Sequence, residues 1–151
     1  MRTARAQADV VLTPEAALRL WRDVSRWATF VEGFAREVER APEWPAAGAR
    51  LVWESTPAGR GRVTEKVVEG EGPDRFVTRV FDERLHGTQT FRVVESERGS
   101  RAELALEYQL TKYGPLSAVA DVIFIRRAIR DSLRRTLFRF AVEAEEEAEL
   151  R

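Results

Sequence analysis

The chain has 151 residues, of which 25 are Lys or Arg and 25 are Asp or Glu, so its formal net charge is zero. This balance gives no overall attraction for nucleic acid, and the absence of cysteine excludes disulfides, thiolate catalysis and cysteine-ligated zinc. No apolar run approaches the length of a membrane span and no signal segment is visible, so we expect one soluble cytoplasmic domain over residues 1–151.

The first part of the chain predicts one strand followed by two short helices. Residues 5–12 alternate loosely between apolar and polar side chains, which is typical of a strand. Thr13-Pro14-Glu15 then starts a helix, because threonine is a good N-cap and proline fits the first helical position. A second short helix is predicted for residues 25–32, and Gly33 ends it.

The middle of the chain predicts an antiparallel meander of about six strands. Turns rich in glycine and proline separate its segments at intervals of roughly 10 to 13 residues, as expected for strands joined by hairpins. The expected strands are residues 34–41, 50–55, 62–69, 75–82, 86–95 and 101–112.

The last quarter predicts one long amphipathic helix from Leu116 to about Glu147, a stretch without glycine or proline. Apolar residues recur there at steps of three and four, which places them on one stripe. They are Val119, Val122, Ile125, Ile129, Leu133, Leu137, Phe140 and Ala144. Six arginines between residues 126 and 139 make the helix too polar to span a membrane. A one-sided helix of about 45 Å needs a broad apolar partner, which we expect to be the sheet.

This order of elements resembles the helix-grip fold of the START/Bet v 1-like (SRPBCC) superfamily, and within it the bacterial polyketide cyclase/dehydrase-like and coenzyme Q-binding-like proteins. The segments that carry the resemblance are Thr13-Pro14-Glu15-Ala16-Ala17, Trp21-Arg22-Asp23-Val24-Ser25-Arg26-Trp27, Gly87-Thr88-Gln89-Thr90-Phe91-Arg92 and Gly99-Ser100-Arg101. The resemblance implies an α+β domain whose curved antiparallel sheet wraps around the C-terminal helix. It also implies an apolar cavity between them that holds a lipid, a quinone or a polyketide.

Three side chains are candidates for chemistry in such a cavity. Tyr108 lies on the apolar phase of the last strand, where its hydroxyl either donates to a ligand carbonyl or bonds to a backbone group in the core. Arg79 either faces the cavity, together with Val77 and Phe81, or lies solvated on the convex face, because both faces of its strand are partly apolar. His86 is the only histidine and is either a general base or a turn residue.

The predicted ligand contacts combine strand positions with the start of the long helix. They are Trp53, Phe81, Leu106, Tyr108, Tyr113, Leu116 and Ile123. With one histidine and no cysteine, we expect no metal site and no cofactor.

Three functions remain open. The first is the binding or transport of a hydrophobic small molecule. The second is an aromatase/cyclase-like enzyme, which would need an enolate-stabilising donor and a proton shuttle inside the cavity. The third is a protein- or membrane-interaction module, because residues 116–125 are apolar nearly all round and could also form a homodimer. No nucleic-acid partner is expected, since we interpret the arginines of the helix as a solvated face.

Overall fold

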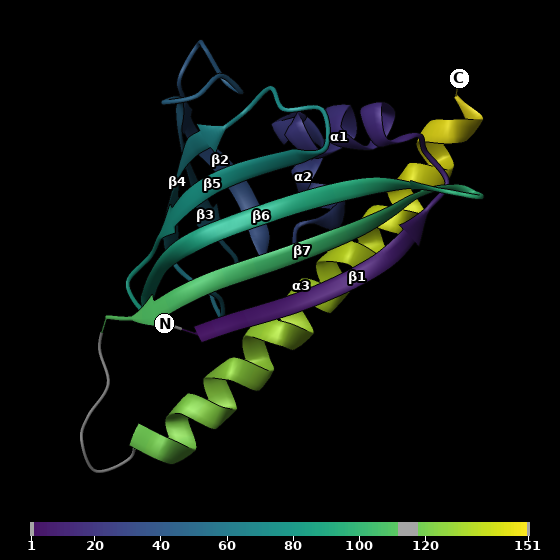
Figure 1. Cartoon of the computed structure of the whole chain (residues 1–151). Helices are drawn as coiled ribbons and strands as arrows, with labels where there is room; N and C mark the ends of the chain where they lie inside the picture. The colour runs from purple at the N-terminus through teal and green to yellow at the C-terminus, as the bar shows by residue number, and fades with distance from the viewer. Residues whose placement is uncertain (1, 112–117, 151) are drawn as a thin grey trace.

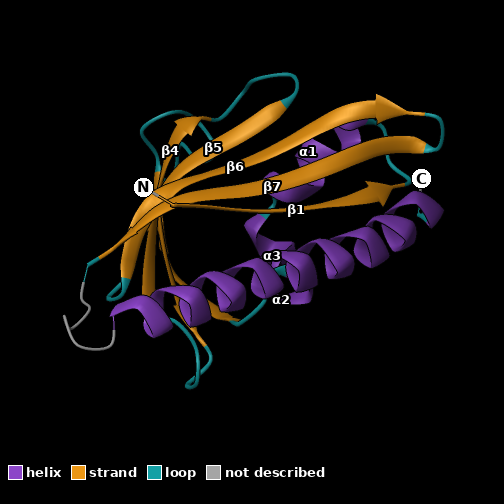
Figure 2. Ribbon diagram, turned by 60° about the horizontal axis from the view of Figure 1, so that its bottom comes forward, coloured by secondary structure: helices purple, strands orange, loops and turns teal. Residues whose placement is uncertain are grey.

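The computed structural model describes residues 2–111 and 118–150, with side chains from residue 123 onward in the second range. Within these ranges, seven strands form one antiparallel sheet in the order β1-β7-β6-β5-β4-β3-β2. The strands are β1 (Arg2–Val10), β2 (Phe34–Arg40), β3 (Arg50–Ser55), β4 (Arg62–Glu69), β5 (Arg75–Phe81), β6 (Leu85–Ser96) and β7 (Gly99–Leu110). The sheet curves around the long helix α3 (Ala118–Glu149), which runs beside β1 (Figure 1 and Figure 2). The predicted helix-grip fold is therefore confirmed.

The segment between β1 and β2 carries the short helices. Helix α1 (Pro14–Arg22) starts as predicted, with proline at the first turn and the Thr13 hydroxyl accepting from the backbone N–H of Ala16 at 3.3 Å. The second predicted helix is shorter than expected, because a 3-10 turn η1 (Val24–Arg26) leads into one turn of α-helix, α2 (Trp27–Phe30). Since β1 and β2 are the two edges of the sheet, this segment crosses its full width.

An aromatic cluster joins α1, the sheet and α3. The ring of Trp21 on α1 stacks on Phe91 of β6 at a centroid distance of 4.2 Å, with the two planes 2° apart. Phe140 of α3 meets both rings edge-on, at 5.5 Å from Trp21 and 5.2 Å from Phe91. All three side chains are buried. Large rings in edge and stacked contact give strong, orientation-dependent packing, so this cluster fixes the second half of α3 on the sheet.

The two halves of α3 have different surroundings. Leu133, Leu137 and Phe140 are buried at the spacing predicted for the inner stripe. Near the start of the helix, by contrast, Ile123 is 57% exposed and Phe124 is 74% exposed. The sheet therefore holds α3 from about Leu133 onward. No helix among the described residues is long and apolar enough to cross a membrane.

Gly87 lies on β6 where the backbone of β7 approaches very closely. It pairs with Val80 on one side and with Tyr108 on the other. A Cβ atom at this position would lie 2.1 Å from the backbone oxygen of Glu107 and 2.9 Å from the Cα of Tyr108. Because both neighbours are backbone atoms that cannot rotate away, only glycine allows β6 and β7 to approach so closely here.

Candidate functional site

A small, partly enclosed cavity of about 40 Å³ lies between the sheet and the middle of α3. This is close to the space of a single water molecule, so a larger ligand requires the surrounding side chains to move. Its apolar lining consists of Trp21, Trp27, Val31, Trp53, Leu104 and Leu133. Its polar lining consists of Glu32, Arg60, Glu65, Gln89, Ser132 and Thr136.

The carboxyl group of Glu65 is the most unusual part of this lining. Glu65 lies in the inward-facing phase of β4 between Val63 and Val67, and only 3% of its surface is exposed. Its Oε2 accepts a hydrogen bond from the Trp53 indole N–H at 2.8 Å, and its Oε1 accepts one from the Thr78 hydroxyl at 3.0 Å. Burial raises the pKa of Glu65, and the nearby charge of Arg60 and both hydrogen bonds oppose this effect only in part. Glu65 therefore keeps its proton to a higher pH than an exposed glutamate.

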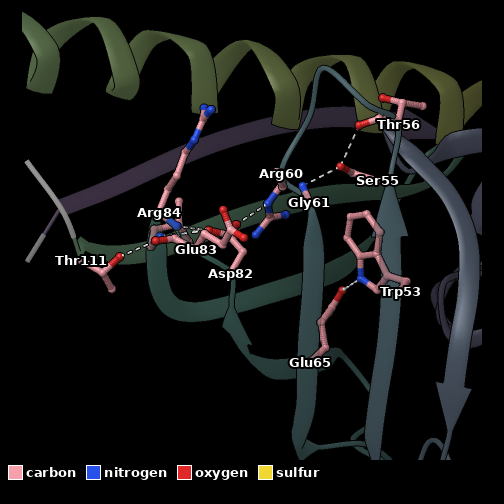
Figure 3. A network of polar contacts seen from close by, with 11 residues as sticks. Trp53, Ser55, Thr56, Arg60, Gly61, Glu65, Asp82, Glu83, Arg84 and Thr111 are labelled. Atoms are coloured by element: carbon pink, nitrogen blue, oxygen red, sulfur yellow. Dashed lines mark hydrogen bonds and ion pairs between the residues drawn. The ribbon is translucent and has the colours of Figure 1, made fainter.

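Arg60 supplies positive charge beside this acid. Its guanidinium lies over the Trp53 ring, 5.7 Å from the ring centroid, and its Nε donates to Asp82 at 2.7 Å. The Asp82 side chain is almost fully buried and also accepts from the backbone N–H groups of Arg84 and Leu85. Figure 3 shows this network beside the Trp53–Glu65 contact. The turn after β5 thus holds Arg60 against the cavity wall, next to a protonatable acid.

The network leaves one donor unused. The Nη2 atom of Arg60 is buried and has no hydrogen-bond partner among the described residues. A buried donor without a partner costs free energy, which a ligand oxygen or an ordered water would recover. The site thus combines an acid that can be neutral, a fixed cation and an aromatic ring around one small space.

Three predicted contacts lie on the inner side of the sheet. Trp53 lines the cavity and binds Glu65. Leu106 and Tyr108 are buried further along β7, and the Tyr108 hydroxyl has no hydrogen-bond partner among the described residues. The alternative in which Tyr108 bonds to a backbone group is therefore not what the structure shows. Whether these three residues contact a ligand stays a prediction.

Three other predicted residues lie on the outer side of the sheet. On β5, Phe76, Thr78 and Val80 face inward, and strand alternation therefore turns Arg79 and Phe81 outward. Phe81 is 42% exposed, and the Arg79 guanidinium lies over its ring and donates to the Thr88 hydroxyl. The prediction that Phe81 lines the cavity is corrected on this ground, and Arg79 is the solvated arginine of the two alternatives.

His86 shares this outer face. It is paired in register with Phe81 and with Gln109, both of which are exposed. Cross-strand partners lie on the same side of a sheet, so the imidazole points away from the cavity. The geometry therefore gives His86 no access to a ligand held between the sheet and α3.

The remaining predicted contacts are at the start of α3. Ile123 is exposed and is absent from the cavity lining, so it does not contact the space around Glu65 in this conformation. Tyr113 and Leu116 lie outside the described residues. The homodimer predicted through Leu116–Ile125 stays a prediction. Among the described residues, no three His, Asp or Glu side chains come together as metal ligands.

The sequence contains a signal for the burial of Glu65, although Glu65 is not among the predicted ligand contacts. The segment Arg62–Glu69 alternates, and the phase that carries Val63 and Val67 also carries Glu65. A carboxylate in the apolar phase of a strand is a residue that the fold must bury, at a cost in free energy. The sequence around Arg60 gives no such signal. Its side chain is placed by a hydrogen bond to Asp82, which belongs to a later hairpin.

Comparison with known proteins identifies the family. The family profile described as "Polyketide cyclase / dehydrase and lipid transport" matches residues 1–145, and the chain belongs to this family. This confirms the superfamily that the sequence predicted. Among curated proteins, none matches the chain.

Solved structures with the same fold come from several bacteria. A Thermus thermophilus protein is 17% identical, covers 97% of this chain and 99% of its own, and has a TM-score of 0.77. A polyketide cyclase-like protein of Corynebacterium glutamicum is 18% identical over 97% of this chain and 93% of its own, with a TM-score of 0.67. The di-domain ARO/CYC protein StfQ of the steffimycin biosynthetic pathway is 15% identical over 97% of this chain and 51% of its own, with a TM-score of 0.72. At these identities the likeness establishes the fold alone.

Proposed function

We propose that this protein binds a hydrophobic small molecule between the sheet and α3, with Glu65 contacting a polar oxygen of the ligand. The observation that carries the proposal is the burial of this carboxyl group at a cavity, held by Trp53 and Thr78, with no salt bridge of its own among the described residues. An apolar side chain would serve a purely structural position on β4 better, because burial of a carboxyl group is costly. Titratable groups perturbed by burial in a cleft are typical of binding and catalytic sites.

The chemistry of the lining supports a ligand with a carbonyl or hydroxyl group. A protonated Glu65 can donate a hydrogen bond to a carbonyl oxygen, and the unused N–H of Arg60 can donate a second. The apolar rings of Trp21, Trp27 and Trp53 would cover the rest of the molecule. Membership of a family described for polyketide cyclisation and lipid transport agrees with this class of ligand.

A second candidate function is catalytic. Glu65 and Arg60 flank the same indole ring, which places a proton donor beside a fixed cation. In an aldol cyclisation, the Glu65 carboxylate would take the α-proton while the Arg60 cation stabilises the enolate oxygen, and Glu65 would then return this proton to the alkoxide that forms at the attacked carbonyl. One similar structure belongs to a di-domain ARO/CYC protein, which favours cyclisation over other reactions as the catalytic function. Binding is required for both functions and is tested first.

The test uses phenylnaphthylamine, an uncharged dye whose fluorescence rises in an apolar site. We expect saturable binding by the native protein. Leu133→Trp should abolish this binding, because Leu133 lines the cavity and a larger ring fills it. The matched control is Arg134→Trp, which puts the same ring on the exposed side of the same helix turn and should bind normally.

Circular dichroism must show that both variants remain folded. Native mass spectrometry of the purified protein should also detect a bound molecule that denaturation releases. Failure of the native protein to bind the dye, or equal binding by the two tryptophan variants, would refute a ligand site in this cavity.

A further inference from the structure

Tyr108 is a buried polar residue that does not line the cavity around Glu65. Only 1% of the residue is exposed, and its hydroxyl has no hydrogen-bond partner among the described residues. Native proteins pair nearly all buried hydroxyls, so an unpaired one points to a group that is absent when the site is empty. Burial raises the pKa of Tyr108, and the charges of Arg2 and Arg126 oppose this effect. The hydroxyl is therefore protonated at neutral pH and can act as a donor.

Arg126 lies close to the apolar stripe of α3 in helical phase. Steps of three and four residues connect it with Ile129 and Leu133, which are half-buried and buried. A residue in this phase faces the sheet, yet the side chain of Arg126 is exposed and forms no ion pair within the described residues. An unpaired cation in this helical phase is unexpected for packing alone, because an apolar residue would continue the stripe.

Two further arginines surround the same end of the site. Arg2 is the cross-strand partner of Tyr108, so its side chain starts from the same face of the sheet. Arg84 extends from the turn after β5 toward α3, as Figure 3 shows. Both are exposed, and neither forms an ion pair with a described acidic side chain. The unpaired hydroxyl therefore lies where the charges of Arg2 and Arg126 both act on it.

The distance to the cavity sets the size of a ligand that would reach this end. Tyr108 lies four residues beyond the cavity residue Leu104 on β7, or about 14 Å along the strand. Arg126 lies seven residues before the cavity residue Leu133 on α3, or about 10 Å along the helix. A molecule with a ring system or a short chain between its two polar ends spans this interval.

We propose that Tyr108, Arg126 and Arg2 form an anion-binding end of the ligand site, and that the natural ligand is a hydrophobic carboxylate. This proposal rests on the proposed function, because the apolar body of the ligand occupies the space near Leu104 and Leu133. The carboxylate accepts from the Tyr108 hydroxyl and from Arg126, and hydrogen bonds between charged partners are the strong ones. The anion also offsets positive charge that no described acidic residue neutralises.

The test compares two dyes with one apolar skeleton. Anilinonaphthalene sulfonate is phenylnaphthylamine with an added sulfonate, so the pair differs only in the anionic group. We expect Arg126→Gln and Tyr108→Phe each to weaken binding of the sulfonate about tenfold, which is the usual size of a lost charge-assisted hydrogen bond. Binding of the uncharged dye should change less than about twofold. Decanoate should displace the sulfonate dye, and decanol should not.

The control variant is Arg127→Gln. It removes the same charge one residue further along, about 100° around the helix and away from the sheet, so it should leave both dyes unaffected. Equal losses in Arg126→Gln and Arg127→Gln, or equal weakening of both dyes by Arg126→Gln, would overturn the anion-binding end while leaving the apolar site intact. Displacement by decanol as strong as by decanoate would also overturn it. Failure of the native protein to bind either dye would remove the proposed function and this inference together.

Discussion

Replacement of Glu65 by glutamine gives the sharpest test of the buried acid. Glutamine has nearly the same shape, keeps an oxygen that can accept from the Trp53 indole and offers an N–H to Thr78, but carries no proton to lose. The two proteins should therefore differ mainly in how their stability depends on pH.

The direction in which folding shifts the pKa of Glu65 determines whether its contribution to stability rises or falls with pH. Burial raises the pKa of Glu65 in the folded state above the unfolded value, which is about 4.3 for a glutamate. Below the unfolded value, both states hold the proton and the neutral acid contributes its full stability. As the pH rises between the two values, the unfolded state releases a proton that the folded state retains. The folded protein is then destabilised by about 1.4 kcal/mol per pH unit, and the loss levels off above the folded pKa.

The assay is urea unfolding, followed by circular dichroism, of the native protein and Glu65→Gln over a pH series from about 4 to about 8. The stability difference should be smallest near pH 4 and should grow in favour of Glu65→Gln as the pH rises, with the slope given above. A difference that stays constant with pH would refute the claim that folding holds this carboxyl in its neutral form. Glu69→Gln on the same strand serves as the control for the loss of a carboxyl group, because Glu69 is half-exposed and pairs with Arg75 at 2.8 Å.

Two further substitutions test the framework around the site. Gly87→Ala should cost about 3 kcal/mol, because its Cβ would meet the backbone of Glu107, and a melting temperature within about 2 °C of the native protein would contradict this. Asp82→Asn should cost about 1–3 kcal/mol, because it removes the charge that pairs with the partly buried Arg60 while keeping an oxygen for the turn. Urea unfolding measures this loss, and an unchanged midpoint would show that the ion pair contributes nothing.

Periodicity made most of the fold predictable. The stripe that contains Leu133, Leu137 and Phe140 predicted both the long helix and the side that it buries, and the structure agrees. Strand β5 was harder, because Val77 and Phe81 make its outer face as apolar as its inner one. The alternation of apolar and polar residues then does not show which face of β5 points toward the core. The contact of Thr78 with Glu65 on the neighbouring strand shows which face is inside, and such a contact depends on register.

The site was less predictable than the fold for a related reason. A glutamate within a strand is ordinarily solvated, so the sequence alone does not mark Glu65 as a buried residue. Its burial depends on Trp53 and Thr78, which come from two other strands. Arg60 reaches the cavity only because Asp82, on a different hairpin, holds it there. These are contacts between segments far apart in the sequence, and local patterns do not specify them.

The pairing of the first strand with the last one has a consequence for how the molecule is made. Strand β1 pairs only with β7 among the described strands, where Arg2 is opposite Tyr108 and Val10 is opposite Ser100. On the ribosome, β1 emerges before residues 99–110 and must wait for them before it has a neighbour in the sheet. Helix α3, which lies against β1, follows later still. Contacts so distant in sequence form late in folding, so the cavity lacks the wall that α3 supplies until this helix has been synthesised.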